Sequence, residues 1–220
     1  MSAGDIRRAR MVRDLKARGI ADSRVLVAMG QVPREPFVEE ALRTKAYDDA
    51  ALPIGEKQTI SQPFVVARMC ELTVPEGQGR VLEIGSGSGY HAAVLSRLFE
   101  QVYSVERIAT FSKRAREAVR ALAIENVHFK IFDGSYGWSE FAPYRAIVVT
   151  AAAPDVPAPL LDQLEEGGRL VLPITAAGAG SSDAGEQTLV RVVKEGGSYR
   201  REEHGPCRFV PLVGKFGWTG

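Results

Sequence analysis

The sequence has 220 residues and a formal net charge of +1, with 45% hydrophobic and 25% charged residues. That length allows one sizeable α/β domain with a buried core, and the composition is typical of a globular protein. The near-neutral charge argues against a nucleic-acid partner, and no apolar run reaches the ~20 residues of a membrane span. Cys70 and Cys207 lack metal or redox spacing, and no signal-peptide core is present, so we expect a reducing cytoplasm.

The chain before Arg80 predicts a helical lead-in rather than a second domain. A basic helix is expected over residues 4–19, where interleaved acids favour a solvated face over an RNA-binding one. Asp22 is a candidate N-cap for a helix over Ser23–Met29. Another short helix should end near Arg43.

Residues 46–63 lack a clear periodicity. This polar, proline-bounded segment precedes a predicted helix over Phe64–Leu72, which makes it a good place for a functional site. Spacing alone favours Ser61 as the N-cap of that helix, so the residue pattern leaves two interpretations open.

Val81–Tyr90 is the most informative stretch. A short apolar run leads into the pattern Glu83-x-Gly85-x-Gly87-x-Gly89, and a helix-like segment follows from Tyr90 to about Phe99. Such a strand, glycine loop and helix let a ligand approach the backbone. A dinucleotide site would place its third glycine where Tyr90 stands. The pattern instead resembles motif I of class I S-adenosylmethionine methyltransferases; a tight turn without ligand is the alternative.

Glu106 directly follows the apolar run Val102–Val105, which is the next predicted strand. It lies 21 positions after Gly85, where nucleotide-binding folds place an acid that accepts the ribose hydroxyls. The alternative is a surface glutamate that caps the following helix.

Asp133 and Gly134 follow the third predicted strand, Asn126–Phe132. An acid here could accept the adenine amino group, and the glycine would leave room for the ring. A β-turn explains this pair equally well.

The rest of the chain continues the alternation of strands and helices, which indicates a mostly parallel sheet. The expected elements are a buried strand (Ala146–Thr150), a helix (Pro157–Leu164), a strand (Arg169–Leu172), a mobile loop (176–186), a hairpin (Gln187–Lys194 with Ser198–Glu203) and a last strand (Cys207–Val213).

We therefore predict an α/β, Rossmann-like class I methyltransferase fold. It should have a mostly parallel twisted sheet flanked by helices, a helical N-terminal extension and a C-terminal β-hairpin. One domain over 1–220 is expected, with a lead-in (1–79), a cofactor-binding core (80–175) and a hairpin with a final strand (176–220).

Taken together, the motifs resemble the protein-L-isoaspartate (D-aspartate) O-methyltransferase family. The segment around Ser61 is more specific than the glycine loop, which most class I methyltransferases share. The matching stretches are Val32–Val38, Ala46–Pro63, Val81–Ala93, Asp133–Gly137, Val149–Leu164, Gly167–Pro173 and Phe209–Leu212.

The resemblance implies a role for each residue of the expected site. Ser61 would be the active-site residue, and Val210 would line the peptide side with Ile60 and Ser61. The cofactor-binding set would be Thr59, Ile60 and Ser61 at its border with substrate, Gly85 and Ser88 at the methionine part, Glu106 at the ribose, Asp133 and Gly134 at the adenine, and also Glu83 and Gly87.

The implied reaction moves a methyl group from S-adenosyl-L-methionine to the free α-carboxylate of an L-isoaspartyl or D-aspartyl residue, leaving S-adenosyl-L-homocysteine. A carboxylate with a pKa near ~4 is ionised at neutral pH and needs no general base. We expect a monomer that acts on damaged peptides and proteins, with no metal, nucleic-acid or membrane partner. The alternatives are a class I methyltransferase for a small molecule or RNA, and a non-catalytic cofactor-binding regulator.

Three positions depart from the family pattern. Phe132 and Lys57 stand where glycine is common, and Arg145 stands where the family usually has Asp. We expect Phe132 to crowd the adenine pocket and Arg145 to lie at the surface.

Overall fold

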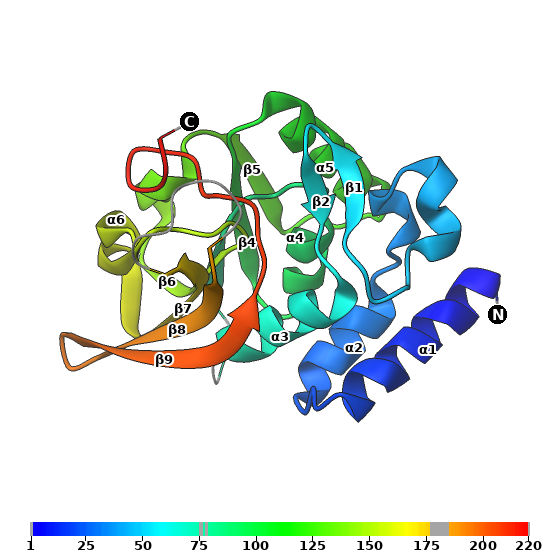
Figure 1. Cartoon of the computed structure of the whole chain (residues 1–220), viewed down its shortest axis with the longest axis horizontal. Coiled ribbons are helices and arrows are strands. Elements are labelled where there is room, and N and C mark those ends of the chain that lie inside the picture. The colour runs from blue at the N-terminus through cyan, green and yellow to red at the C-terminus, as the bar shows by residue number, and fades with distance from the viewer. Residues whose placement is uncertain (1, 75–76, 78, 177–184, 220) are drawn as a thin grey trace.

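A seven-stranded sheet forms the centre of the computed structural model, which describes residues 2–74, 77, 79–176 and 185–219. Its strands are β3 (Arg80–Ile84), β4 (Gln101–Glu106), β5 (Val127–Ile131), β6 (Tyr144–Val149), β7 (Leu164–Thr175), β8 (Gln187–Glu195) and β9 (Ser198–Cys207). Their order is β5-β4-β3-β6-β7-β8-β9 (Figure 1). The pairings from β5 to β7 are parallel and the last two are antiparallel, as the predicted fold requires.

Helices cover both faces of this sheet because successive strand residues point in opposite directions. In β3, Val81 faces one hydrophobic cluster and Leu82 faces the other. The sheet is accompanied by helices α3 (Pro63–Thr73), α4 (Tyr90–Leu95), α5 (Ala109–Ala121) and α6 (Ala158–Asp162), and by short 3₁₀ turns η3 (Gly134–Tyr136) and η4 (Ser139–Phe141). The first cluster packs under α3, α4 and α5, and the second includes Leu160 of α6.

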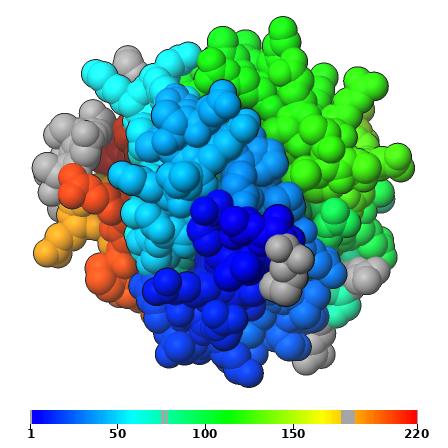
Figure 2. Space-filling view, turned by 90° about the vertical axis from the view of Figure 1, so that its right-hand side faces the viewer, coloured from blue at the N-terminus to red at the C-terminus, as the bar shows by residue number. Residues whose placement is uncertain are grey.

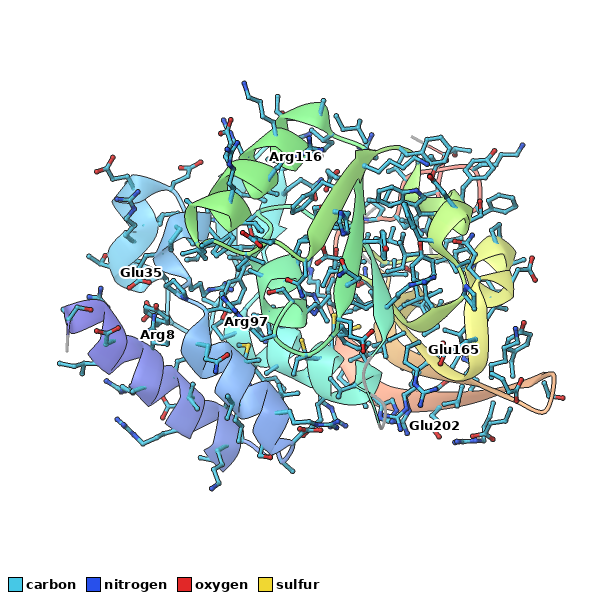
Figure 3. The ribbon with its side chains drawn as sticks, turned by 180° about the vertical axis from the view of Figure 1, so that it is seen from behind. Arg8, Glu35, Arg97, Arg116, Glu165 and Glu202 are labelled. Atoms are coloured by element: carbon cyan, nitrogen blue, oxygen red, sulfur yellow. The ribbon has the colours of Figure 1, made fainter. Side chains whose placement is uncertain are left out.

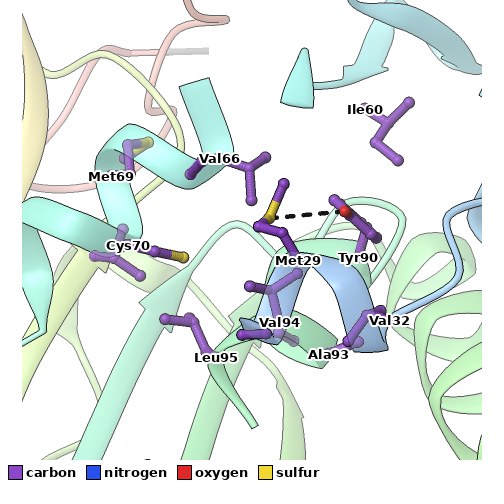
Figure 4. Close-up of a cluster of buried hydrophobic side chains, with 14 of the residues drawn as sticks. Met29, Val32, Ile60, Val66, Met69, Cys70, Tyr90, Ala93, Val94 and Leu95 are labelled. Carbon is purple, nitrogen blue, oxygen red and sulfur yellow. Dashed lines mark hydrogen bonds between the residues drawn. The ribbon is translucent and has the colours of Figure 1, made fainter. Parts of the chain in front are cut away.

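The lead-in packs onto this core through α2. It comprises α1 (Ala3–Ala17), α2 (Ser23–Gln31), and 3₁₀ turns η1 (Glu35–Phe37) and η2 (Glu40–Lys45). Met29 of α2 accepts a weak hydrogen bond from the Tyr90 hydroxyl at 3.8 Å, among buried side chains of α3 and α4 (Figure 4). Figure 2 shows the lead-in covering one side of the molecule, with the α5 region beside it. As predicted, Asp22 caps α2 by accepting from the Arg24 backbone N–H at 2.8 Å.

Charged side chains gather at the periphery. Arg8 and Glu35 lie beside each other at the lead-in end, whereas Glu165 and Glu202 lie toward the opposite end of the molecule (Figure 3). Glu165 pairs with Arg145 at 2.6 Å, and the side chain of Arg145 is half-buried rather than freely solvated.

The segment 46–63 contains a hairpin that the sequence analysis missed. Strands β1 (Leu52–Gly55) and β2 (Gln58–Ile60) pair antiparallel across a two-residue turn. Glu56 and Lys57 in that turn have φ values of 46° and 58°. Short hairpins favour this left-handed region, in which glycine fits without strain, so Lys57 holds a backbone conformation that glycine would adopt more easily.

Two other expected boundaries were wrong, and a third expectation is not tested. The predicted strand Cys207–Val213 is not continuous: β9 ends at Cys207, and isolated bridges join Pro211 to Ala152 and Val213 to Trp218. The helix predicted over Pro157–Leu164 ends at Asp162 because Leu164 already begins β7. The predicted mobile loop 176–186 falls mainly on residues 177–184, which lie outside the described residues.

The contact between Gly89 and α5 predicts a test of the fold. Gly89 has φ +88°, and an added Cβ would lie 2.9 Å from the Ala115 Cβ. Gly89→Ala should lower the free energy of unfolding by about 2–4 kcal/mol, from backbone strain plus overpacking. Gly19→Ala is the matched control, because Gly19 has φ +99° with nothing within 4 Å of an added Cβ. If urea unfolding showed the same loss of stability in Gly89→Ala and Gly19→Ala, the contact with Ala115 would be unimportant.

Candidate active site

A cavity opens at the carboxyl ends of β3, β4 and β6, where open α/β sheets bind their ligands. Its volume is about 870 Å³ including the mouth, within the range of small-molecule sites. The lining comes from β2 and the residue after it, the loop between β3 and α4, the end of β4, and residues 210–213 near the C-terminus. Nine predicted site residues line it: Thr59, Ile60, Ser61, Gly85, Gly87, Ser88, Glu106, Gly134 and Val210.

The glycine loop presents bare backbone to this cavity. Gly85 has φ +94°, and a Cβ there would overlap Thr150 Oγ1. Thr150 Oγ1 donates a hydrogen bond to the Gly85 carbonyl at 2.7 Å, which anchors the loop to the end of β6. A side chain is excluded at this point, so a ligand can approach the main chain.

Glu83 does not line the cavity but supports the loop from below. Its side chain is fully buried and accepts a hydrogen bond from Ser104 Oγ, which lies 2.5 Å from Ser86 Oγ. Burial raises the pKa of Glu83 to about 8. His91, which does line the cavity, holds Nδ1 3.9 Å from Glu83 Oε1 and Nε2 3.3 Å from Cys70 Sγ. Burial lowers the pKa of His91 to about 4, so this histidine is neutral near pH 7.

Glu106 is the last residue of β4 and lies at the cavity with only 7% of its surface exposed. Its Oε2 accepts from the Gly87 N–H and its Oε1 from the Ile108 N–H, both at 3.0 Å. The interpretation as a surface glutamate is therefore wrong, although the bond to Ile108 does help cap α5. Each carboxylate oxygen can accept a further hydrogen bond, as a ribose diol would require.

Of the neighbouring residues Asp133 and Gly134, only Gly134 lies at the cavity. Gly134 lines the cavity, and a Cβ there would overlap Ile84. Asp133 does not line it: Oδ1 accepts from Ser135 N at 2.9 Å and Oδ2 from Lys215 N at 2.8 Å. These bonds match the turn alternative, and an adenine contact by the Asp133 carboxylate stays a prediction.

Ser61 lies at the cavity between β2 and α3. Gln62, not Ser61, precedes α3 as its N-cap residue, and no side-chain capping bond is present there. The N-cap interpretation of Ser61 is therefore wrong. The Ser61 carbonyl accepts a hydrogen bond from Arg34 Nη2 at 2.6 Å, and Ser61 lines the cavity together with Thr59 and Ile60.

Residues 210–213 of the C-terminal segment form part of the cavity wall. The Val210 carbonyl accepts from Ala152 N at 2.8 Å, and Leu212 N donates to the Ala152 carbonyl at 2.8 Å. These two bonds hold Val210 and its neighbours against the end of β6, although no continuous strand forms there.

The sequence analysis missed several lining residues, including Gln58, His91, Ile108, Phe111 and Thr150. Ile108 and Thr150 carried a usable signal, because each follows the carboxyl end of a predicted parallel strand closely. The expected crowding by Phe132 was wrong, since this side chain is 43% exposed, lies outside the cavity and packs 5.8 Å from Tyr136.

The parallel sheet, the bare glycine loop and the acid after the second sheet strand define a class I methyltransferase fold. Comparison with known proteins makes this more specific: the chain belongs to the protein-L-isoaspartate(D-aspartate) O-methyltransferase family, whose model matches residues 6–217. Protein-L-isoaspartate O-methyltransferase 2 of Geotalea uraniireducens is 52% identical, covering 98% of this chain and 97% of its own. The Geobacter metallireducens enzyme is 53% identical, covering 97% of each chain.

Solved structures agree with this assignment. One protein-L-isoaspartate O-methyltransferase aligns with a TM-score of 0.84 at 34% identity, covering 96% of this chain and 67% of the other. A Plasmodium falciparum structure described as a beta-aspartate methyltransferase, in complex with S-adenosyl-L-homocysteine, aligns with a TM-score of 0.80 at 25% identity. The alignment covers 94% of this chain and 98% of the other.

The buried pair Glu83 and His91 predicts a pH dependence of stability. The folded-state pKa of Glu83 is raised from 4.5, so between pH 4.5 and 8 the folded state holds a proton that the unfolded state loses, and stability falls as pH rises. The lowered pKa of His91 gives the opposite slope below pH 6.5. From pH 6.5 to 8 the Glu83 effect should therefore remain, costing roughly 1–2 kcal/mol.

Glu83→Gln should remove this slope, because glutamine keeps the shape of the side chain and does not titrate. Urea unfolding of both proteins at pH 6.5 and pH 8 measures the difference. Parallel pH profiles for wild type and variant would show that Glu83 is ionised in the folded state.

Proposed function

We propose that this protein methylates the free α-carboxylate of L-isoaspartyl and D-aspartyl residues in damaged proteins and peptides, using S-adenosyl-L-methionine. The observation that carries the proposal is that Ser61 lines the same cavity as Val210 and the glycine loop. Family membership over residues 6–217 supports it.

The cavity suits an S-adenosyl nucleoside. The backbone around Gly85 and Gly87 would hold the methionine part together with Ser88, Glu106 would accept the ribose hydroxyls, and Gly134, which packs against Ile84, would border the adenine. We keep Glu83 in the cofactor site as a support of the loop rather than as a contact. S-adenosyl-L-methionine supplies a methyl group that its sulfonium already activates.

The protein's own contribution is then positioning and exclusion of water. An ionised carboxylate needs no proton removed, and neutral, buried His91 is not required as a base. Ser61 Oγ can donate a hydrogen bond to one acceptor oxygen and so direct the other toward the methyl group. Thr59 and Ile60, also at the cavity, would border cofactor and acceptor.

Methyl transfer to isoaspartyl peptide, with the aspartyl isomer, RNA and small-molecule panels as comparisons, tests the proposal. Transfer to RNA or a small molecule alone would favour the alternative class I methyltransferase. Binding of the cofactor without any transfer in a single turnover would favour a regulatory module.

We further propose that the protein works as a monomer in the cytoplasm, without metal or nucleic acid, and that 1–220 act as one unit. Within the described residues, Cys70 and Cys207 form no disulfide, which fits a reducing compartment. One hydrophobic cluster spans lead-in and sheet, which supports the single unit. None of the described helices is long and apolar enough to cross a membrane. Within the described ranges no His, Cys, Asp and Glu side chains group to hold a metal ion.

Glu106→Gln should weaken cofactor binding. The change removes the charge and one acceptor oxygen, and hydrogen bonds to charged groups contribute roughly 1.5–3 kcal/mol, so Kd should rise about 10- to 100-fold. Calorimetry with S-adenosyl-L-homocysteine measures this. Glu165→Gln is the control, because Glu165 pairs with Arg145 and does not line the cavity. An unchanged Kd for Glu106→Gln would contradict the ribose assignment.

Ser61→Ala should slow methyl transfer far more than it weakens cofactor binding. Losing one hydrogen bond to the charged acceptor should reduce kcat/KM by roughly 10- to 150-fold. The Kd of S-adenosyl-L-homocysteine should stay within about twofold, because Ser61 makes no hydrogen bond to the glycine loop or Glu106 among the described residues. Wild-type turnover in this variant would remove Ser61 from the mechanism.

A further inference from the structure

Arg34 is a fully buried cation in the lead-in, with 0% of its surface exposed. No carboxylate of the described residues lies within 4.0 Å of its guanidinium. Burial lowers the pKa of Arg34, yet arginine stays protonated in proteins. The charge of Asp49 acts on Arg34 only from beyond ion-pair distance, and the direct hydrogen-bond partners of the guanidinium are neutral carbonyls. A buried charge held in this way is costly, so this arrangement calls for a role beyond packing.

The guanidinium joins three segments that are distant in sequence. Its Nε donates to the Ala46 carbonyl at 2.7 Å and its Nη2 to the Ser61 carbonyl at 2.6 Å. Its plane lies over the ring of Tyr90, 4.6 Å from the centroid. Nη1 is buried and finds no acceptor among the described residues. The Arg34 fork thus connects the lead-in, the Ser61 segment and the helix that follows the glycine loop.

We propose that Arg34 is a positioning residue for the acceptor carboxylate. It fixes the Ser61 peptide, so that the Ser61 hydroxyl stays at the cavity, and its charge favours an anion there. The inference rests on the proposed function. Arg34 does not itself line the cavity, so it acts through Ser61 rather than by touching substrate. Lysine could not replace it, because a single ammonium lacks the planar fork that spans two carbonyls.

Two substitutions distinguish the effect of the planar guanidinium group from the effect of the positive charge. Arg34→Lys keeps the charge, and Arg34→Gln removes it. We expect KM for an isoaspartyl peptide to rise at least about tenfold in Arg34→Lys and further in Arg34→Gln, while the Kd of S-adenosyl-L-homocysteine changes less than about threefold. Arg169→Lys is the matched control, because Arg169 also donates to a backbone carbonyl, that of Val74 at 2.6 Å, outside the cavity.

A double-mutant cycle distinguishes positioning from general support of the fold. If Arg34 acts through Ser61, the double variant Arg34→Lys with Ser61→Ala should have a kcat/KM less than about threefold below that of Ser61→Ala alone. Fully additive losses, or equal rises in peptide KM and cofactor Kd, would overturn the inference. A wild type that does not methylate the peptide would instead overturn the proposed function.

Tyr47→Phe covers the case in which Arg34 variants do not fold. The Tyr47 hydroxyl accepts from the Arg34 backbone N–H at 3.2 Å, so its removal loosens Arg34 without removing the charge. A rise in peptide KM with an unchanged cofactor Kd supports the inference, and unchanged values of both contradict it.

Discussion

The close approach of the glycine loop to its neighbours is the constraint on which the site depends. Gly85 lies against Thr150 at the end of β6, and Gly89 lies against Ala115 of α5. Both need a left-handed backbone as well as the missing side chain, so two independent requirements select glycine at each position. The loop is thereby fixed from both sides, and Glu106 can accept from its Gly87 N–H at 3.0 Å.

The specific part of the site is built outside the sheet. The glycine-loop end of the cavity comes from the parallel strands of the class I methyltransferase fold, whereas Ser61 and Val210 come from segments that precede and follow those strands in sequence. Arg34 and Met29 attach the first of these segments to Tyr90, directly after the glycine loop. The Ser61 segment and the glycine loop therefore share one packed residue, Tyr90, which gives their relative placement at the cavity a physical basis.

The sequence predicted best where one local rule dominates. Continuous apolar runs such as Ala146–Thr150 identified the central strands, and the alternate glycines located the loop. Sequence-based prediction failed where tertiary contacts determine the structure. In the turn of the β1–β2 hairpin, two residues other than glycine have positive φ, so the glycine that usually marks a two-residue hairpin turn is absent from the sequence. The N-cap expectation for Ser61 was wrong because the carbonyl bond from Arg34, 27 residues away, cannot be read from local spacing.

Asp133 shows how such long-range contacts alter a motif's meaning. Local sequence offers only a turn or an adenine acceptor, but the structure adds Lys215 N, which donates to Oδ2 from 82 residues away. Phe216 N similarly donates to Ser135 Oγ at 3.1 Å. The turn that carries Gly134 is thus held by the same C-terminal segment that brings Val210 to the cavity. Gly134 and Val210 are linked here by hydrogen bonds from backbone N–H groups to the Asp133 and Ser135 side chains, as the Ser61 segment and the glycine loop are linked through Tyr90.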